Sequence, residues 1–234
     1  WKAGTSFTND ASATGIGSVD STGSVNTDAG FSIINVVKNN TTAHTVAHGL
    51  GAVPQMIIGK SRTGGSYRWI VYHQAIGNTH ALYLNENFVK TDSVTFWNDT
   101  TPTSSVFSLG TDNSWNGTSI FYCFAEKKGY SKFGTFISNN TTNNVYTGFA
   151  PSMVILKSTT STNDWTIQDI KRPGANPAAK VYPNLNNDED DDNDIDFLSN
   201  GFKIRGALGA NTFVYMAWAN NPFVTSTGIP GTAR

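Results

Sequence analysis

The hydrophobic residues of this chain fall in short runs separated by polar turns. Residues 55–60 are almost continuously apolar, as expected for a strand that is covered on both faces. Residues 67–73 alternate instead, which places Trp69, Val71 and His73 on one face of a strand. Helical periodicity is missing almost everywhere. Short strands between Gly, Asn and Pro turns predict an all-β chain built as β-sandwiches or jelly rolls.

The same pattern predicts about seven short strands in each half of the chain. In the first half we expect strands at residues 31–37, within 44–51, and at 55–60, 67–73, 81–85, 94–97, 105–109 and 118–126. In the second half we expect them at 133–137, 145–148, 152–157, 164–170, 180–183, 201–205 and 212–220.

Two stretches of the chain resemble each other in order and spacing. Pro54 and Pro151 each open an apolar run, and the runs end in Lys60 and Lys157 at the same offset. A tryptophan follows each run at nearly the same distance, Trp69 nine residues after Lys60 and Trp165 eight after Lys157. Further matches keep nearly this offset along the whole chain, so we expect a tandem duplication of a unit of roughly 100 residues.

The repeat and the composition divide the chain into four segments. Residues 1–29 are small, polar and glycine-rich, and predict a linker or an extended arm. Residues 30–128 and 129–223 are the two expected β-sandwich repeats, and residues 224–234 form a polar tail. Two small domains of this length are each long enough to bury a core.

The composition argues against several classes of binding partner. Charged residues make up 14% of the chain, against about 25% in typical proteins. The net charge of -1 gives no electrostatic reason to expect nucleic acid or an anionic membrane as partner. No apolar run is long enough to span a bilayer. The single cysteine, Cys123, lies in an apolar run, so we expect a buried and inert thiol.

Tryptophan provides the candidate ligand contacts. Trp97 stands beside Asn98 and Asp99, and Trp115 beside Asn116, among polar loop residues. An exposed aromatic ring next to amides and a carboxylate is typical of a loop that contacts a glycan. The alternative is that these loops pack against a neighbouring subunit. By contrast, tryptophans 69 and 165 occupy the same place in each repeat, which favours a role in the core.

An acidic run in the second repeat is the candidate metal site. Asp188, Asp190, Asp192 and Asp194 offer hard oxygen ligands at a density that could hold Ca²⁺. The EF-hand pattern is missing, however, and a solvated surface loop is the more ordinary explanation of the run. We expect no other cofactor.

The four histidines are spread over the first repeat. His44 and His48 flank Val46 in an extended segment, and no cysteine or carboxylate stands near them in sequence to complete a ligand set. His73 and His80 are similarly isolated. We therefore expect structural hydrogen bonds from these side chains and no metal.

Catalytic motifs are missing from the sequence. It has no nucleophile elbow, no P-loop, no HExxH run and no pair of carboxylates in apolar surroundings. Its carboxylates at 86, 92, 99 and 126 are scattered. The residues shared by the two repeats are apolar or aromatic. We therefore expect no enzymatic activity.

Several longer motifs stand out along the chain: residues 48–54 with the run ending at 60, 121–126, 129–134, 146–151, 193–203 and 221–223. Together these motifs resemble a domain of unknown function found in marine tailed phages. That family occurs in large virion-associated proteins, often beside concanavalin-like lectin domains, and offers no catalytic residues to carry over. The chain departs from it in the acidic run, and in Trp218-Ala219-Asn220, where the family more often has Phe-Ala-Glu.

The resemblance implies a structural and adhesive module of a virion appendage, such as a tail fibre or spike. Such a module would lie on the virion surface as a homo-oligomer, commonly a trimer. Its partners would be other virion proteins and a host surface glycan. Two alternatives stay open: a head-decorating or capsid-stabilising protein without host contact, and a glycan depolymerase, which would need facing carboxylates.

Overall fold

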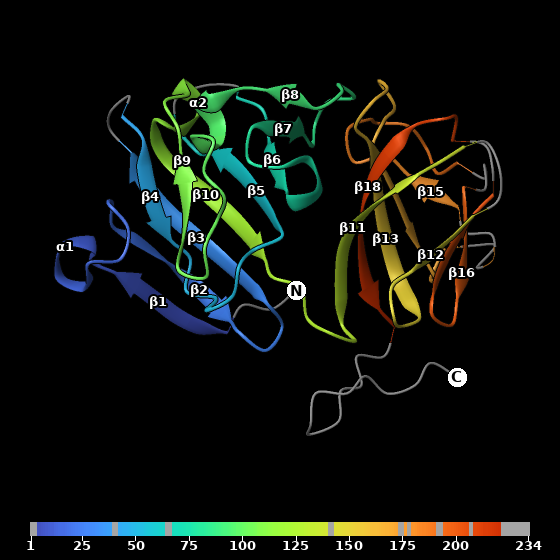
Figure 1. Ribbon diagram of the computed structural model, residues 1–234, viewed down its shortest axis with the longest axis horizontal. Helices are drawn as coiled ribbons and strands as arrows, with labels where there is room; N and C mark the ends of the chain where they lie inside the picture. The colour runs from blue at the N-terminus through green and yellow to red at the C-terminus, as the bar shows by residue number, and fades with distance from the viewer. Residues whose placement is uncertain are drawn as a thin grey trace. The chain divides into compact units, whose positions relative to one another are not determined.

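The chain folds into two compact units that consist almost entirely of antiparallel strands (Figure 1). The computed structural model describes residues 4–38, 42–63, 67–139, 143–172, 176, 179–190, 194–205 and 208–220. Unit 1 runs to Leu84 and resumes from Lys90 to Ala125, and unit 2 comprises Asn85–Val89 and the chain from Glu126 onward. All-β architecture, as predicted from the sequence, is confirmed.

Unit 1 contains ten strands and four short helical turns among its described residues. They are β1 (Thr5–Asn9), α1 (Ala11–Thr14), β2 (Ser21–Asn26), β3 (Phe31–Lys38), β4 (His44–Ala47), β5 (Met56–Ser61), β6 (Ile70–His73), η1 (Gln74–Ile76), β7 (His80–Tyr83), β8 (Thr91–Asp92), α2 (Val94–Trp97), β9 (Val106–Leu109), η2 (Asn113–Trp115) and β10 (Gly117–Phe124).

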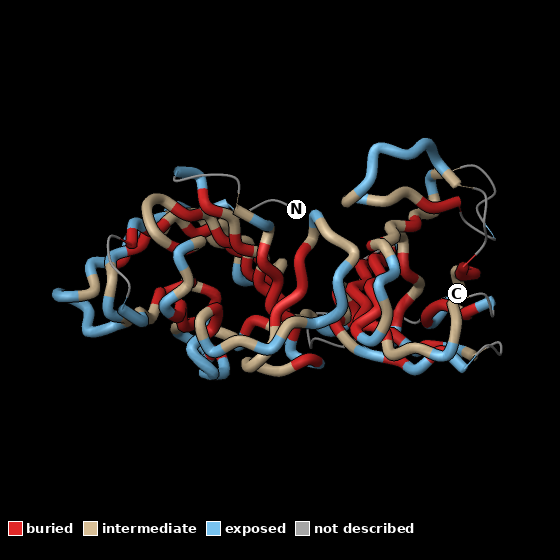
Figure 2. Tube along the Cα trace, turned by 90° about the horizontal axis from the view of Figure 1, so that it is seen from above, coloured by how far each residue is buried: buried red, intermediate tan, exposed pale blue. Residues whose placement is uncertain are grey.

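Two sheets enclose the core of unit 1. The larger has the order β1-β2-β3-β10-β5-β6-β7-β8, and the smaller pairs β4 with β9. Alternate residues of the large sheet, such as Ile34, Ile57 and Phe121, face Val46 and Phe107 of the small one in a single buried cluster. Figure 2 shows that buried stretches of the trace alternate with exposed ones.

Unit 2 repeats this two-sheet plan on a smaller scale. Its strands are β11 (Ser131–Ile137), β12 (Asn143–Tyr146), β13 (Pro151–Ser158), β14 (Thr166–Asp169), β15 (Lys180–Val181), β16 (Ile195–Leu198), β17 (Gly201–Ile204) and β18 (Thr212–Ala219). The five-stranded sheet has the order β11-β18-β13-β14-β15, and the three-stranded sheet β12-β17-β16. Val154, Leu156 and Tyr215 of the first share a buried cluster with Phe202 and Ile204 of the second.

The strand orders of the two units correspond. In each large sheet the last strand of the unit lies beside the first long one, β10 beside β3 and β18 beside β11. The strand that contains the proline-led apolar run comes next, β5 in unit 1 and β13 in unit 2. This agreement is what a repeat would produce, while the duplication itself stays a prediction.

The structure differs from the sequence analysis in the first 29 residues, for which we expected a linker or extended arm. Strands β1 and β2 pair with each other, and β2 pairs with β3 along its full length. Between them, Asp10 caps the single turn of α1 by accepting hydrogen bonds from the amides of Ser12 and Ala13. Hydroxyl-rich β-formers extend the sheet of unit 1 here, although they bury little apolar surface. The expected tail, residues 224–234, lies outside the described residues.

A second difference concerns residues 94–97, which we expected as a strand. They form the single helical turn α2, because the Ser93 hydroxyl accepts a hydrogen bond from the Thr95 amide at the start of the turn. At its end, Asn98 and Asp99 adopt left-handed backbone angles, with φ of 54° and 44°. Both residue types tolerate this conformation better than most.

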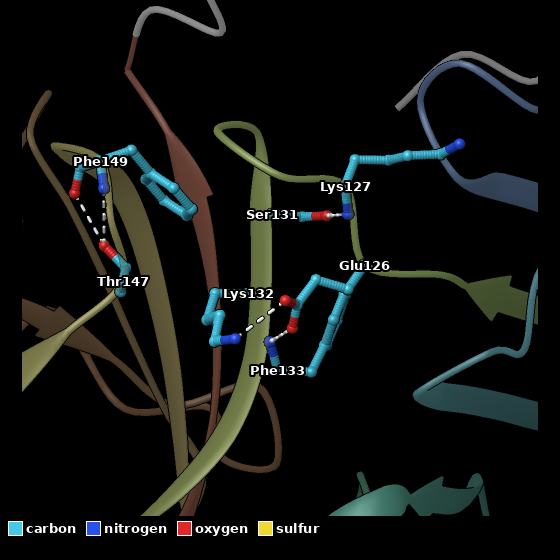
Figure 3. Close-up of polar contacts among 7 residues, drawn as sticks. All are labelled: Glu126, Lys127, Ser131, Lys132, Phe133, Thr147 and Phe149. Atoms are coloured by element: carbon cyan, nitrogen blue, oxygen red, sulfur yellow. Dashed lines mark hydrogen bonds and ion pairs between the residues drawn. The ribbon is translucent and has the colours of Figure 1, made fainter. Parts of the chain in front are cut away.

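The start of unit 2 is fixed by polar contacts (Figure 3). The Lys127 amide donates to the hydroxyl of Ser131 at 3.0 Å, which closes the turn that precedes β11. One residue earlier, the carboxylate of Glu126 binds the ammonium of Lys132 at 2.8 Å and accepts from the Phe133 amide at 3.4 Å. The predicted joint at residues 127–130 is therefore an ordered turn.

Candidate functional site

The two tryptophans expected in exposed loops lie inside unit 1. Trp97 is 2% exposed and Trp115 is 0% exposed. Their ring centroids are 5.4 Å apart, and Trp115 also packs against Phe121 at 5.3 Å. The expectation of exposed rings that stack on a glycan is therefore wrong.

The physical reason is that each loop closes into a helical turn that directs the indole inward. Trp115 ends η2, which Asp112 caps by accepting from the Ser114 amide. The indole Nε1 of Trp115 donates to the backbone oxygen of Phe96 at 2.9 Å, so its one polar atom is satisfied inside the core. The Nε1 of Trp97 has no hydrogen-bond partner among the described residues, so its burial depends on the apolar surface that the ring removes from water.

The polar neighbours of these tryptophans hold the loops in place. Asn98 and Asp99 are exposed, and the backbone oxygen of Asp99 accepts from the side chain of Asn78 at 2.7 Å. Asn116 accepts through Oδ1 from the ammonium of Lys38 at 3.4 Å. These contacts are structural, because they hold the backbone at Asp99 and the side chain of Asn116 in place.

The structure describes part of the acidic run, and the ammonium group of Lys180 contacts two of its carboxylates. The Nζ atom of Lys180 lies 3.2 Å from Asp194 Oδ1 and 3.8 Å from Asp190 Oδ2. Asp188 is exposed, and Asp192 lies outside the described residues. In the part of the chain that the structure describes, no three His, Cys, Asp or Glu side chains are grouped to hold a metal ion.

The described histidine contacts are structural, as expected. His48 is fully buried, and its Nδ1 accepts from the Leu50 amide at 3.2 Å. Its Nε2 lies 3.1 Å from the backbone oxygen of Thr103. Burial lowers the pKa of His48 below its usual value, so the ring is neutral at pH 7.

Cys123 is buried in unit 1, which confirms the expectation for this thiol. Burial raises the pKa of Cys123 to about 12. The thiol therefore stays protonated at neutral pH and is a poor nucleophile.

The sequence analysis missed two buried polar side chains in unit 2. Lys157 is 0% exposed, and its ammonium donates to the backbone oxygens of Ser158 at 2.8 Å and Asn87 at 3.2 Å. Burial lowers the pKa of Lys157 to about 8. Gln168 is also 0% exposed, and neither polar atom of its amide has a hydrogen-bond partner among the residues that the structure describes. Lysine and glutamine on a strand predict exposure, so only the three-dimensional structure could have found them.

The comparisons with known proteins assign the chain to a family. A family model described as Domain of unknown function (DUF7483) matches residues 1–222. The chain belongs to this family. A single DUF7483 match therefore extends over both units.

Comparisons at the level of whole proteins add little to this assignment. No curated protein matches the DUF7483 chain. Among solved structures, the major capsid protein P2 from bacteriophage PM2 shares 11% identity over 82% of this chain and 100% of that one, with a TM-score of 0.26. So low a TM-score supports no argument about the fold or function of the DUF7483 chain. None of the described helices is long and apolar enough to cross a membrane.

Proposed function

We propose that this chain is a structural module of a phage virion, which acts by packing against neighbouring proteins and not by catalysis. The single observation that carries the proposal is the burial of Trp97 and Trp115. These two side chains, which the sequence analysis expected to bind an external ligand, belong to the hydrophobic core of unit 1. The sequence motifs that resemble virion-associated domains of tailed phages supply the location.

Ion pairs between charged side chains also support a structural role. Glu126 is paired with Lys132, Asp194 with Lys180, and Asp196 with Arg205, within 3.2 Å in each case. Each of these carboxylates is engaged in an ion pair within its own unit, which is a structural use of the charge. The proposal therefore assigns the chain no reaction.

The proposal places the chain on the virion surface, in a tail fibre, spike or similar appendage. Head decoration is the alternative location for the same structural role. In either place the partners are other virion proteins and further copies of the chain, most simply three about a common axis. The contacts with these partners would stabilise the assembled particle.

Quantitative mass spectrometry of purified particles of the phage that encodes this chain tests the proposal. We expect the chain in the particles at a fixed copy number relative to the major capsid protein. Particles should keep that copy number through density-gradient purification. The proposal fails if the chain is abundant in the infected-cell lysate and missing from the purified particles.

A further inference from the structure

Unit 2 contains a small polar pocket that includes Lys180 and Asp194 of the acidic cluster described above. Its volume is about 280 Å³, slightly below the range of about 300–1,000 Å³ typical of small-molecule sites. The turn between β13 and β14 provides Thr162, Asn163 and Asp164. Apolar surface comes from Leu208 and Phe213.

The strand register brings a row of polar side chains to this pocket. Thr166 of β14, together with Lys180 and Tyr182 of the β15 segment, lines the cavity. Gln168 pairs with Lys180 across the sheet, and residues two apart on a strand share a face. The unpartnered amide of Gln168 therefore lies on the same face as these three side chains.

A buried ion pair forms one wall of the pocket. Lys180 and Asp194 are 8% and 4% exposed, and the Lys180 ammonium binds both carboxylate oxygens, at 3.2 Å and 3.3 Å. The hydroxyl of Tyr182 donates to Asp190. Taking two charges out of water is costly, so a pair like this is weak evidence for a purely stabilising role.

Several polar groups of the pocket have hydrogen-bonding capacity to spare. In the described part of the chain, the side chains of Thr162, Asn163 and Thr166 make no hydrogen bond within the protein. Asp164 accepts one bond, through Oδ1 from the amide of Asn184 at 2.6 Å. These groups can serve a ligand without breaking an existing contact.

We propose that this pocket binds one neutral saccharide ring. Carboxylate, amide and hydroxyl groups suit the vicinal hydroxyls of a sugar, and the partly exposed Leu208 offers apolar surface to its C–H face. The carboxylates disfavour an anion. The Lys180 ammonium, which lies within 3.8 Å of both Asp190 and Asp194, disfavours a divalent cation. The inference goes beyond the proposed function and does not depend on it.

NMR titration of the ¹⁵N-labelled 234-residue chain tests the proposal. The probes are D-glucose, D-galactose, D-mannose and N-acetyl-D-glucosamine at millimolar concentrations, each added separately, with CaCl₂ as a fifth titrant. We expect at least one sugar to shift the amide signals of residues 162–166 and 180–182 in a saturable manner. CaCl₂ should leave these signals in place.

Two pocket variants and two matched controls define the site. Thr166→Val keeps the shape and β-propensity of the strand residue and removes an uncommitted hydroxyl, and Asp164→Asn removes the charge. Each is expected to weaken the sugar about tenfold, as loss of one buried hydrogen bond would. Thr8→Val in β1 and Asp92→Asn in β8, both exposed in unit 1, should leave the affinity unchanged.

The proposal is overturned if no sugar shifts the pocket signals, if the shifts map elsewhere, or if both pocket variants bind as the wild type does. It is also overturned if CaCl₂ shifts these signals and the sugars do not. Absence of the chain from virions would refute the structural role and leave this result standing. The two failures can therefore be told apart.

Discussion

His48 illustrates how a single polar residue is held inside unit 1. Because the Leu50 amide donates to Nδ1, the ring hydrogen is on Nε2 and is donated to the backbone oxygen of Thr103. A proton on Nδ1 would remove the acceptor that Leu50 requires. The folded state therefore favours the neutral ring.

We predict that the chain loses stability in mild acid. Burial lowers the folded-state pKa of His48 below the usual 6.5, so the unfolded chain binds more protons as the pH falls. The stabilising contribution is present above about pH 6.5 and is lost below it. Thermal melts between pH 7.5 and pH 5 should show a falling midpoint. His48→Gln, which keeps a donor for Thr103, should show a shallower fall, and an unchanged slope would contradict this account.

Trp115 gives a second prediction at this scale. Trp115→Phe removes the bond to the Phe96 oxygen and leaves a void next to Trp97 and Phe121. We expect a loss of about 2–4 kcal/mol in the free energy of unfolding, measured by chemical denaturation. Trp69→Phe is the control, because Trp69 is only partly buried, and should cost less. A Trp115→Phe variant as stable as the wild type would mean that this indole is not a core residue.

At the scale of elements, β2 is the segment for which composition was most misleading. Its sequence of small polar residues is equally suited to a linker and to a strand. The distinguishing feature is a close approach at Gly23, where a Cβ atom would lie 1.9 Å from the backbone oxygen of Ile33. Only glycine allows β2 this position beside β3.

We therefore predict that Gly23→Ala destabilises unit 1 by about 1–3 kcal/mol, because the backbone must shift to admit the methyl group. Gly4→Ala is the matched control, since a Cβ atom at Gly4 meets nothing within 4 Å. The measurement is the thermal midpoint of the two variants beside the wild type. Equal thermal midpoints for Gly23→Ala and the wild type would contradict close packing of β2 against β3 and would favour the prediction that residues 1–29 form a linker.

The sequence predicted some elements well because their signal is local. The proline-led runs at β5 and β13 and the long final strands β10 and β18 lie where apolar residues predicted them. Residues 94–97, β-branched and aromatic, also have the composition of a strand. Their helical form depends on the cap at Ser93 and the left-handed backbone at Asn98, which propensity alone does not reveal.

Sites were harder to predict than strands because they depend on contacts between distant segments. Trp97 packs against Trp115, and Asp194 is paired with Lys180, which lies 14 residues earlier in the sequence. The pocket of unit 2 joins residues 162–164, 166, 180, 182, 194, 208 and 213, which no motif connects. Only the register of β14 with β15 brings its polar row together.

At the scale of the whole molecule, two small β units with paired charges and buried aromatic rings suit a structural role. Neither the family match nor the comparison with solved structures assigns a mechanism, and fold alone never does. The proposed structural role therefore depends on whether the chain is part of the virion. Its central claim is that the chain is an ordered part of the particle.

A cryo-electron microscopy map of the intact virion tests this claim most directly. We predict density for both units at fixed, symmetry-related positions, with copies of the chain in contact with one another or with other virion proteins. Trp97 and Trp115 should lie inside unit 1 in every copy. A complete map of the particle with no density that fits either unit would contradict the account.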